Sequence, residues 1–298
     1  MSPSVLLGAV EQGLLYSLVA LGLYLSYRTL DIADLTTDGT FTLGMACSAV
    51  LTVRGDPAAG LLLALGAGAL AGGITALLQT KLGVQPILAG IVTMTGLYSV
   101  NLMVMGGRSN LNLLREETVF TAAETFFGPW GKLLMAGAAA LAAGVLLLLF
   151  LRTQLGLSIR ATGDNREMVA SSSIDPALTT TVGLCAANAL VGLSGGLLAQ
   201  YQKFADMSLG TGMVVIGLAS LIIGEVVTGR RGVGHGITAA ILGAVIYRII
   251  IAAALVANVG AQNFKLVSAV IVAAAISYPT ILEKLRFWKR RREAAKHG

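Results

Sequence analysis

The sequence has few charged residues, few prolines and few cysteines, and each shortage excludes a class of protein. Charged residues make up 12% of the 298 residues, about half the fraction in a soluble globular domain, so they cannot cover a water-facing surface. The 6 prolines form no linker, which favours a single domain. The cysteines, Cys47 and Cys185, both lie in apolar segments, which argues against a disulfide framework and a zinc site.

The sequence also lacks the residues that enzyme chemistry requires. No G-x-x-x-x-G-K-[ST] phosphate loop is present, because the Gly131-Lys132 pair has the wrong spacing and no hydroxyl residue follows it. The 2 histidines have no metal-ligand spacing, and no nucleophile and base stand together. We therefore expect no enzyme activity, no cofactor and no metal, and we expect any ATP hydrolysis to occur on a separate subunit.

Apolar residues dominate the composition. They reach 55% of the chain, with 37 glycines and a mean hydropathy of +0.80. This composition predicts an all-α fold, a polytopic membrane helix bundle in contact with membrane lipid, in which glycines let helices approach closely. We expect about nine spans over Pro3–Tyr27, Asp38–Val53, Ala58–Thr80, Pro86–Met105, Gly131–Leu151, Ala177–Gln200, Met213–Thr228, Gly234–Val256 and Phe264–Leu282.

Several of these segments contain glycine or polar residues, which predicts broken or short helices near the centre of the bundle. Residues 1–282 form the predicted transmembrane domain and residues 283–298 a basic tail. The N-terminus has no basic region, and its apolar stretch is too long for a secretory signal, so we expect it to remain as the first span. The loop Gly106–Trp130 is expected outside, either touching a substrate-delivering protein or forming a solvated loop with a short surface helix.

Positive charge is distributed unequally along the chain. Counting nine crossings back from a cytoplasmic tail places fourteen Lys and Arg residues on the cytoplasmic side and six on the other, with Arg248 inside a span. This excess follows the positive-inside rule and places the protein in the cell (inner) membrane with the N-terminus outside and the C-terminus in the cytoplasm. The rule also explains the tail as a cytoplasmic anchor, so we expect no nucleic-acid partner.

Polar residues inside the spans are the candidates for a substrate pathway, because a charge there is costly unless it is paired or hydrated. Asp34, Thr36, Asp38 and Gly39 form a stretch that cannot be a simple lipid-facing helix. Its hydroxyl groups suit the cap of a half-helix. We expect this stretch to line the central pathway; the alternative is a short cytoplasmic connector between two spans.

Glu225 and Arg248 are the further pathway candidates. Glu225 is expected near the inner surface, either as a gate residue or as the ion-pair partner of Arg230 or Arg231. Arg248 lies about fourteen residues into its span, roughly 20 Å along it. It either attracts a substrate carboxylate, pairs with Glu11, or extends toward the outer interface.

The loop 152–176 is expected on the cytoplasmic side and is rich in basic residues and glycine. Asn165–Ala170 is a helix-capable stretch, with Asp164 or Asn165 as its cap and Glu167 in its first turn, where a negative charge suits the helix dipole. A short amphipathic helix parallel to the membrane is a handle that a partner protein can push.

Three stretches resemble one family in the same order. They are Thr153–Ala170 followed by Ile174-Asp-Pro, Leu30–Phe41 with its Asp-Leu-Thr core, and the glycine-rich run Gly210–Gly212, Ala219–Glu225 and Arg231–Gly234. Together they are similar to the permeases of ABC importers in the branched-chain amino acid and ribose permease superfamily. The first motif resembles most closely the amino-acid permeases, including the tryptophan/tyrosine group, and Asp38 and Glu225 depart from the ribose branch.

The resemblance implies a permease subunit that forms the pathway for a small polar solute, in particular an amino acid. It implies three partners: cytoplasmic ATP-binding subunits, an extracytoplasmic solute-binding protein and a second permease subunit, expected to be a copy of this chain. The coupling loop would contact the ATPase, which assigns that role to Gly156, Arg160, Gly163, Asn165, Glu167 and Met168.

Two other classes of protein compete with this interpretation. An ion-gradient-driven secondary transporter also carries acidic residues inside its spans, but it usually has inverted repeats, and none is evident here. An intramembrane enzyme would need clustered catalytic side chains, which the sequence does not show.

Overall fold

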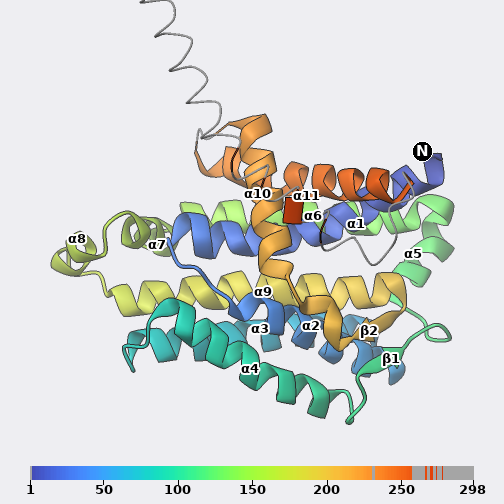
Figure 1. The fold of residues 1–298 in the computed structure, drawn as a ribbon, viewed down its shortest axis with the longest axis horizontal. Coiled ribbons are helices and arrows are strands. Elements are labelled where there is room, and N and C mark those ends of the chain that lie inside the picture. Colours follow the sequence, from blue (N-terminus) through green and yellow to red (C-terminus); the bar gives the residue numbers. More distant parts are fainter. Residues whose placement is uncertain are drawn as a thin grey trace, which may run out of the picture.

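The computed structural model describes residues 2–229 and 232–256, with isolated positions at 266, 269, 270, 273 and 277. Apart from those positions, the predicted span Phe264–Leu282 lies outside the described residues, and so does the whole basic tail. The described residues form a helical bundle whose long helices mostly run along the long axis of the molecule, while α10 crosses them (Figure 1).

Eight of the predicted apolar segments correspond to eight helices, which confirms the all-helical bundle for the described residues. The long helices are α1 (Pro3–Leu23), α2 (Thr36–Val53), α3 (Pro57–Thr80), α4 (Pro86–Val104), α6 (Gly131–Arg152), α9 (Pro176–Gln202), α10 (Met213–Thr228) and α11 (Val233–Val256). The π-helical turn η1 (Tyr24–Thr29) continues α1. The shorter helices are α5 (Val119–Phe127), η2 (Gly128–Trp130), α7 (Gln154–Asp164), α8 (Arg166–Ser171) and η3 (Met207–Gly210).

The predicted count of nine spans is not confirmed. Among the described residues, 6 helices are long and apolar enough to cross a membrane, counting α1 with η1 and α5 with α6 as continuous segments. The helix α10 has 16 residues, a length of about 24 Å, which is shorter than the roughly 30 Å of a hydrocarbon core. The helix α2 falls outside the group of 6 as well, and it begins with Thr36, Thr37 and Asp38.

Opposite ends of the bundle carry different accessory elements (Figure 1). The N-terminus, α5 and a small antiparallel sheet of β1 (Asn110–Asn112) and β2 (Phe204–Asp206) lie at one end, and α7 and α8 lie at the other. The helix α5 is the short helix expected in the loop Gly106–Trp130, and Thr118 caps it. The sheet was not expected from the sequence; it joins that loop to the segment after α9.

Glycines allow the backbones of α2, α3 and α9 to pack directly against one another where the helices cross. A methyl group on Gly44 of α2 would overlap the carbonyl oxygen of Gly192 on α9, and one on Gly68 of α3 would overlap that of Asn188. Apolar side chains on neighbouring helices gain nothing by leaving lipid for each other, so close van der Waals packing holds such helices together. The abundance of glycine in the sequence therefore has a direct structural use.

We predict that Gly44→Ala destabilises the protein by about 1–3 kcal/mol, the usual cost of overpacking a tight contact. The matched control is Gly66→Ala in α3, because a methyl group there meets no atom within 4 Å. Thermal unfolding of the purified variants in detergent would measure both changes. Equal melting temperatures for the two variants would show that the α2–α9 crossing is not as tight as described.

Candidate functional site

Asp34 lies at the centre of the bundle, in the irregular segment between η1 and α2. The residue is 2% exposed. One carboxylate oxygen accepts a hydrogen bond from Nδ2 of Asn188 on α9 at 2.6 Å, and the other accepts one from the backbone N–H of Thr36 at 2.9 Å. A buried carboxylate is tolerated only when it is hydrogen-bonded or paired. These bonds therefore hold the segment that precedes α2 against the middle of α9.

The first turn of α2 is held by α3 and α4. The hydroxyl group of Thr36 lies 2.7 Å from that of Thr75 on α3. A Cβ atom on Gly39 would lie 3.1 Å from the side chain of Leu97 on α4, and the carbonyl oxygen of Gly39 accepts a hydrogen bond from Asn101 of α4. The predicted stretch from Asp34 to Gly39 is thus packed inside the bundle. A role in the substrate pathway stays a prediction.

Asp38 joins the starts of α2 and α10. Its two carboxylate oxygens accept hydrogen bonds from the backbone N–H groups of Gly212 at 2.8 Å and Val214 at 2.9 Å. The first N–H groups of a helix have no partner within the helix and carry partial positive charge. The N-cap residue of α10 is Gly212, which has no side chain to satisfy them. A carboxylate from another helix therefore caps α10.

The other end of α10 carries Glu225, which forms an ion pair with Arg28 at 2.8 Å. The side chain of Glu225 is 7% exposed and that of Arg28 is 41% exposed. Arg28 belongs to η1, and π-helical turns are rare and occur frequently at functional sites. Arg230 and Arg231, the partners expected from the sequence, lie outside the described residues. The gate role of Glu225 remains a prediction.

Arg248 lies between α11 and α1. Its guanidinium group lies 4.4 Å from the centre of the Tyr16 ring and is hydrogen-bonded to the side chain of Gln12. Glu11 accepts a hydrogen bond from Tyr201 at 2.8 Å, and Glu11 and Arg248 form no ion pair among the described residues. The Glu11–Arg248 pair, one of the three alternatives left open by the sequence, is therefore not formed in this structure. Attraction of a substrate carboxylate by Arg248 stays a prediction.

The loop 152–176 contains two helices where the sequence predicted one. In α7, methyl groups on Gly156 and Gly163 would overlap backbone atoms of Phe150 and Thr29 respectively. The hydroxyl group of Thr162 lies 2.8 Å from that of Thr179 on α9. The helix α7 is thus seated on the ends of α6, η1 and α9. The pattern of α7 was missed because its apolar positions are few.

The short helix α8 is confirmed at Arg166–Ser171. Of the two caps expected from the sequence, Asn165 is the one that forms: its side-chain oxygen accepts a hydrogen bond from the N–H of Met168 at 3.0 Å. Glu167 lies in the first turn and is exposed, and Met168 is 55% exposed. The α8 helix therefore exposes both charged and apolar side chains at the surface of the described bundle.

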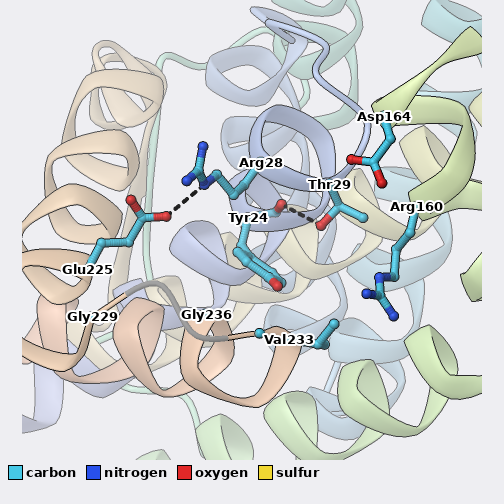
Figure 2. Close-up of a pocket in the computed structure, with 10 residues that line it drawn as sticks. Tyr24, Arg28, Thr29, Arg160, Asp164, Glu225, Gly229, Val233 and Gly236 are labelled. Carbon is cyan, nitrogen blue, oxygen red and sulfur yellow. Dashed lines mark hydrogen bonds and ion pairs between the residues drawn. The ribbon is translucent and has the colours of Figure 1, made fainter.

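A polar pocket of about 210 Å³ lies where η1, α7, α10 and α11 meet (Figure 2). Ten residues line it: Tyr24, Arg28, Thr29, Arg160, Asp164, Glu225, Gly229, Gly232, Val233 and Gly236. The ion pair of Arg28 and Glu225 forms part of its wall, and the Thr29 hydroxyl group donates to the carbonyl oxygen of Tyr24. Arg160, expected from the resemblance to contact an ATPase, borders this pocket.

Sequence reasoning missed Arg28, Tyr24 and Thr29. Arg28 and Glu225 are far apart in the sequence, so no local pattern reveals their pairing. The sequence signal that could have revealed the pair is the depth of the two residues in the membrane, because both fall at the ends of predicted spans on the same side. Opposite charges at the same depth are candidates for pairing, because each is costly to bury alone.

The comparisons with known proteins agree with one family. Residues 5–281 match the sequence model described as "Branched-chain amino acid transport system / permease component". The chain is 34% identical over 273 residues to the "Tyrosine transport system permease protein" of Clostridioides difficile (strain R20291), covering 91% of this chain and 90% of that protein. It is 34% identical over 223 residues to the "Uncharacterized protein RP368" of Rickettsia prowazekii (strain Madrid E), covering 74% and 77%. No solved structure matches the chain.

We predict that Asp38→Ala lowers the free energy of unfolding by about 1–3 kcal/mol, because two N–H groups of α10 lose their acceptor. Asp38→Asn should cost less, since it keeps one acceptor oxygen. The control is Asp56→Ala: Asp56 precedes α3, is exposed and makes no side-chain bond to that helix. Thermal unfolding in detergent would measure the series, and a loss for Asp56→Ala as large as that for Asp38→Ala would contradict the capping role.

Proposed function

Because the chain belongs to the family of branched-chain amino acid transport system permease components, we propose that it forms half of the pathway of an ATP-driven importer for an amino acid. The chain is a permease subunit of an ABC importer and a multi-pass membrane protein. We assign ATP hydrolysis to separate cytoplasmic subunits and solute capture to an extracytoplasmic binding protein. The other half of the pathway comes from a second permease subunit, a copy of this chain, related by twofold symmetry.

The observation that carries this proposal is the elbow formed by α7 and α8 at one end of the bundle (Figure 1). One side of the elbow is seated on the bundle through Gly156, Gly163 and the buried Val169. The other side exposes Arg166, Glu167 and Met168. An element anchored on one side and free on the other suits the transmission of force from a partner that stays outside the membrane. We place this elbow in the cytoplasm and the N-terminus outside.

Contacts on the described residues offer a route from the elbow to the middle of the membrane. Gly163 of α7 lies against the backbone of Thr29 in η1. The neighbouring Arg28 pairs with Glu225 at the end of α10. The start of α10 is bonded to Asp38 of α2. A displacement of α7 would therefore reach α2 through two charged contacts and one short helix.

The starts of α2 and α10 are the part of the pathway that we propose contacts the solute. Irregular backbone at membrane depth is tolerated where protein or a water-filled cavity covers it. Transporters place their binding sites at such interrupted helices. The bonds of Asp34 and Asp38 support this assignment, because they keep the interrupted backbone in one arrangement. Glu225 acts in this scheme as the residue that closes the inner end.

The proposed solute is an aromatic amino acid. This rests on the relative named as a tyrosine transport system permease protein, which aligns with 91% of the chain. An importer driven by an ion gradient would have no use for the elbow. Uptake by the reconstituted complex should therefore survive collapse of the ion gradients and stop when ATP is removed; the opposite pattern would contradict the proposal.

We predict that replacing Arg166, Glu167 and Met168 together by Ala reduces copurification of the ATPase subunit by roughly tenfold or more, the effect of removing one interface hot spot. Alanine favours the helix, so α8 itself should persist. The control replaces Phe126 and Phe127 of α5 by Ala, because both are exposed at the opposite end of the bundle.

Affinity pulldown from membranes expressing both subunits would measure the association. Unchanged recovery of the ATPase with the α8 variant would exclude this helix as its docking site.

A further inference from the structure

Among the residues that the structure describes, equal numbers of positive and negative side chains line the pocket between η1, α7, α10 and α11. Two arginines, Arg28 and Arg160, and two acids, Asp164 and Glu225, line it. Arg28 and Glu225 are paired with each other at 2.8 Å. Arg160 and Asp164 are exposed, and neither forms an ion pair within the described part of the chain. The pocket therefore contains one cation, Arg160, and one anion, Asp164, that have no ion-pair partner among the described residues.

The geometry separates these charges around an aromatic ring. Figure 2 shows Tyr24 between the Arg28–Glu225 pair and Arg160, with Val233 below and Asp164 on the far side of Thr29. Glycines complete the wall, and Gly236 lies so close to the Tyr24 ring that a methyl group there would overlap it. The absence of a side chain on Gly236 thus lets the Tyr24 ring lie against α11, and the ring supplies an apolar surface.

The size of the pocket restricts its ligand. Its volume of about 210 Å³ is below the roughly 300–1,000 Å³ of sites for drug-sized ligands. A peptide or a whole lipid would not fit, whereas a single small molecule would. The charged residues described in its lining are two arginines and two acids, so phosphate or another anion would meet two carboxylates as well as the arginines. A zwitterion, with a carboxylate for Arg160 and an ammonium group for Asp164, complements the two charges that the Arg28–Glu225 pair leaves over among the described residues.

We propose that this pocket binds a free zwitterionic α-amino acid from the cytoplasmic side and that occupancy opposes transport. The Arg160 guanidinium takes the ligand carboxylate, Asp164 takes the ammonium group, and the Tyr24 ring contacts the side chain. The pocket lies between α7 and the end of α10, so a bound ligand resists their relative movement. Accumulated solute would then slow its own import. This inference rests on the proposed function, because it takes the imported amino acid as the ligand.

Binding can be measured without transport. The purified permease–ATPase complex, free of the solute-binding protein, would be titrated with L-tyrosine by calorimetry. Tyramine, which lacks the carboxylate, and 3-(4-hydroxyphenyl)propionate, which lacks the ammonium group, should each bind roughly tenfold more weakly or worse, because each loses a charge-assisted contact. Equal affinity for all three compounds would overturn the zwitterion assignment.

Variants locate the site. Arg160→Ala should lower L-tyrosine affinity by roughly tenfold or more, through loss of the carboxylate contact. Val233→Phe should lower it as well by filling the pocket while keeping every charge. The control Arg152→Ala removes an exposed arginine at the end of α6 that does not line the pocket, and it should retain binding. Binding unaffected by both pocket variants would overturn the location.

The regulatory consequence is tested in proteoliposomes with ATP and the ATPase on the outside, so that the cytoplasmic face is accessible. L-Tyrosine added on that side should slow ATP-driven transport in the parent complex and slow it much less in Val233→Phe. If ATP drives transport but added L-tyrosine has no effect, the pocket proposal fails and the importer function stands. If there is no ATP-driven transport of any amino acid, the proposed function fails.

A zwitterionic phospholipid headgroup shares the ligand chemistry and provides the last test. The calorimetric titration would be repeated in nanodiscs with and without phosphatidylethanolamine. If this lipid competes with L-tyrosine and abolishes its binding, the pocket is a site for the lipid headgroup and the proposal is overturned. The same L-tyrosine affinity in both lipid compositions supports the free amino acid.

Discussion

The starting N–H groups of a helix inside a membrane protein need an acceptor, and the structure depends on how α10 obtains one. Water is scarce there, so unsatisfied N–H groups would cost several kcal/mol. Gly212 cannot cap the helix, and Asp38 of α2 does so with both carboxylate oxygens. This bond places the starts of the two helices side by side. It also explains why an acidic residue occurs in an apolar part of the chain.

The opposite end of α10 is held by a different kind of contact. The Arg28–Glu225 pair is exposed on the arginine side and buried on the glutamate side. Exposed ion pairs contribute little to stability, whereas a buried carboxylate without a partner is costly. Separating Arg28 from Glu225 and giving each a new partner therefore costs less free energy than removing Asp38 from the start of α10. The helix α10 is thus held strongly at its start and weakly at its end, which suits an element that moves during transport. The proposed amino-acid pocket lies beside the weakly held end.

Local patterns predicted much of the chain. The eight apolar segments within the described residues became helices, and Asn165 caps α8 as one of the two expected residues. The helix α7 was missed because it combines small, polar and basic residues without a clear apolar stripe. The small sheet of β1 and β2 was missed because each strand has three residues, too few to show alternation. The ion pair of Arg28 with Glu225 was missed, because sequence reasoning favours neighbours and proposed the nearer Arg230 and Arg231, which lie outside the described residues.

The sequence by itself determined the membrane environment, the family resemblance and the absence of a phosphate loop. Composition, the order of motifs and residue spacing are properties of the chain alone. It also placed Asp34, Asp38 and Glu225 as polar groups that need partners. Only the tertiary structure decided what those partners are: Asn188, the start of α10 and Arg28. The physical reason is that a buried polar group can be satisfied by any donor brought near it. Which donor arrives depends on how glycine-rich helices cross, which no local pattern specifies.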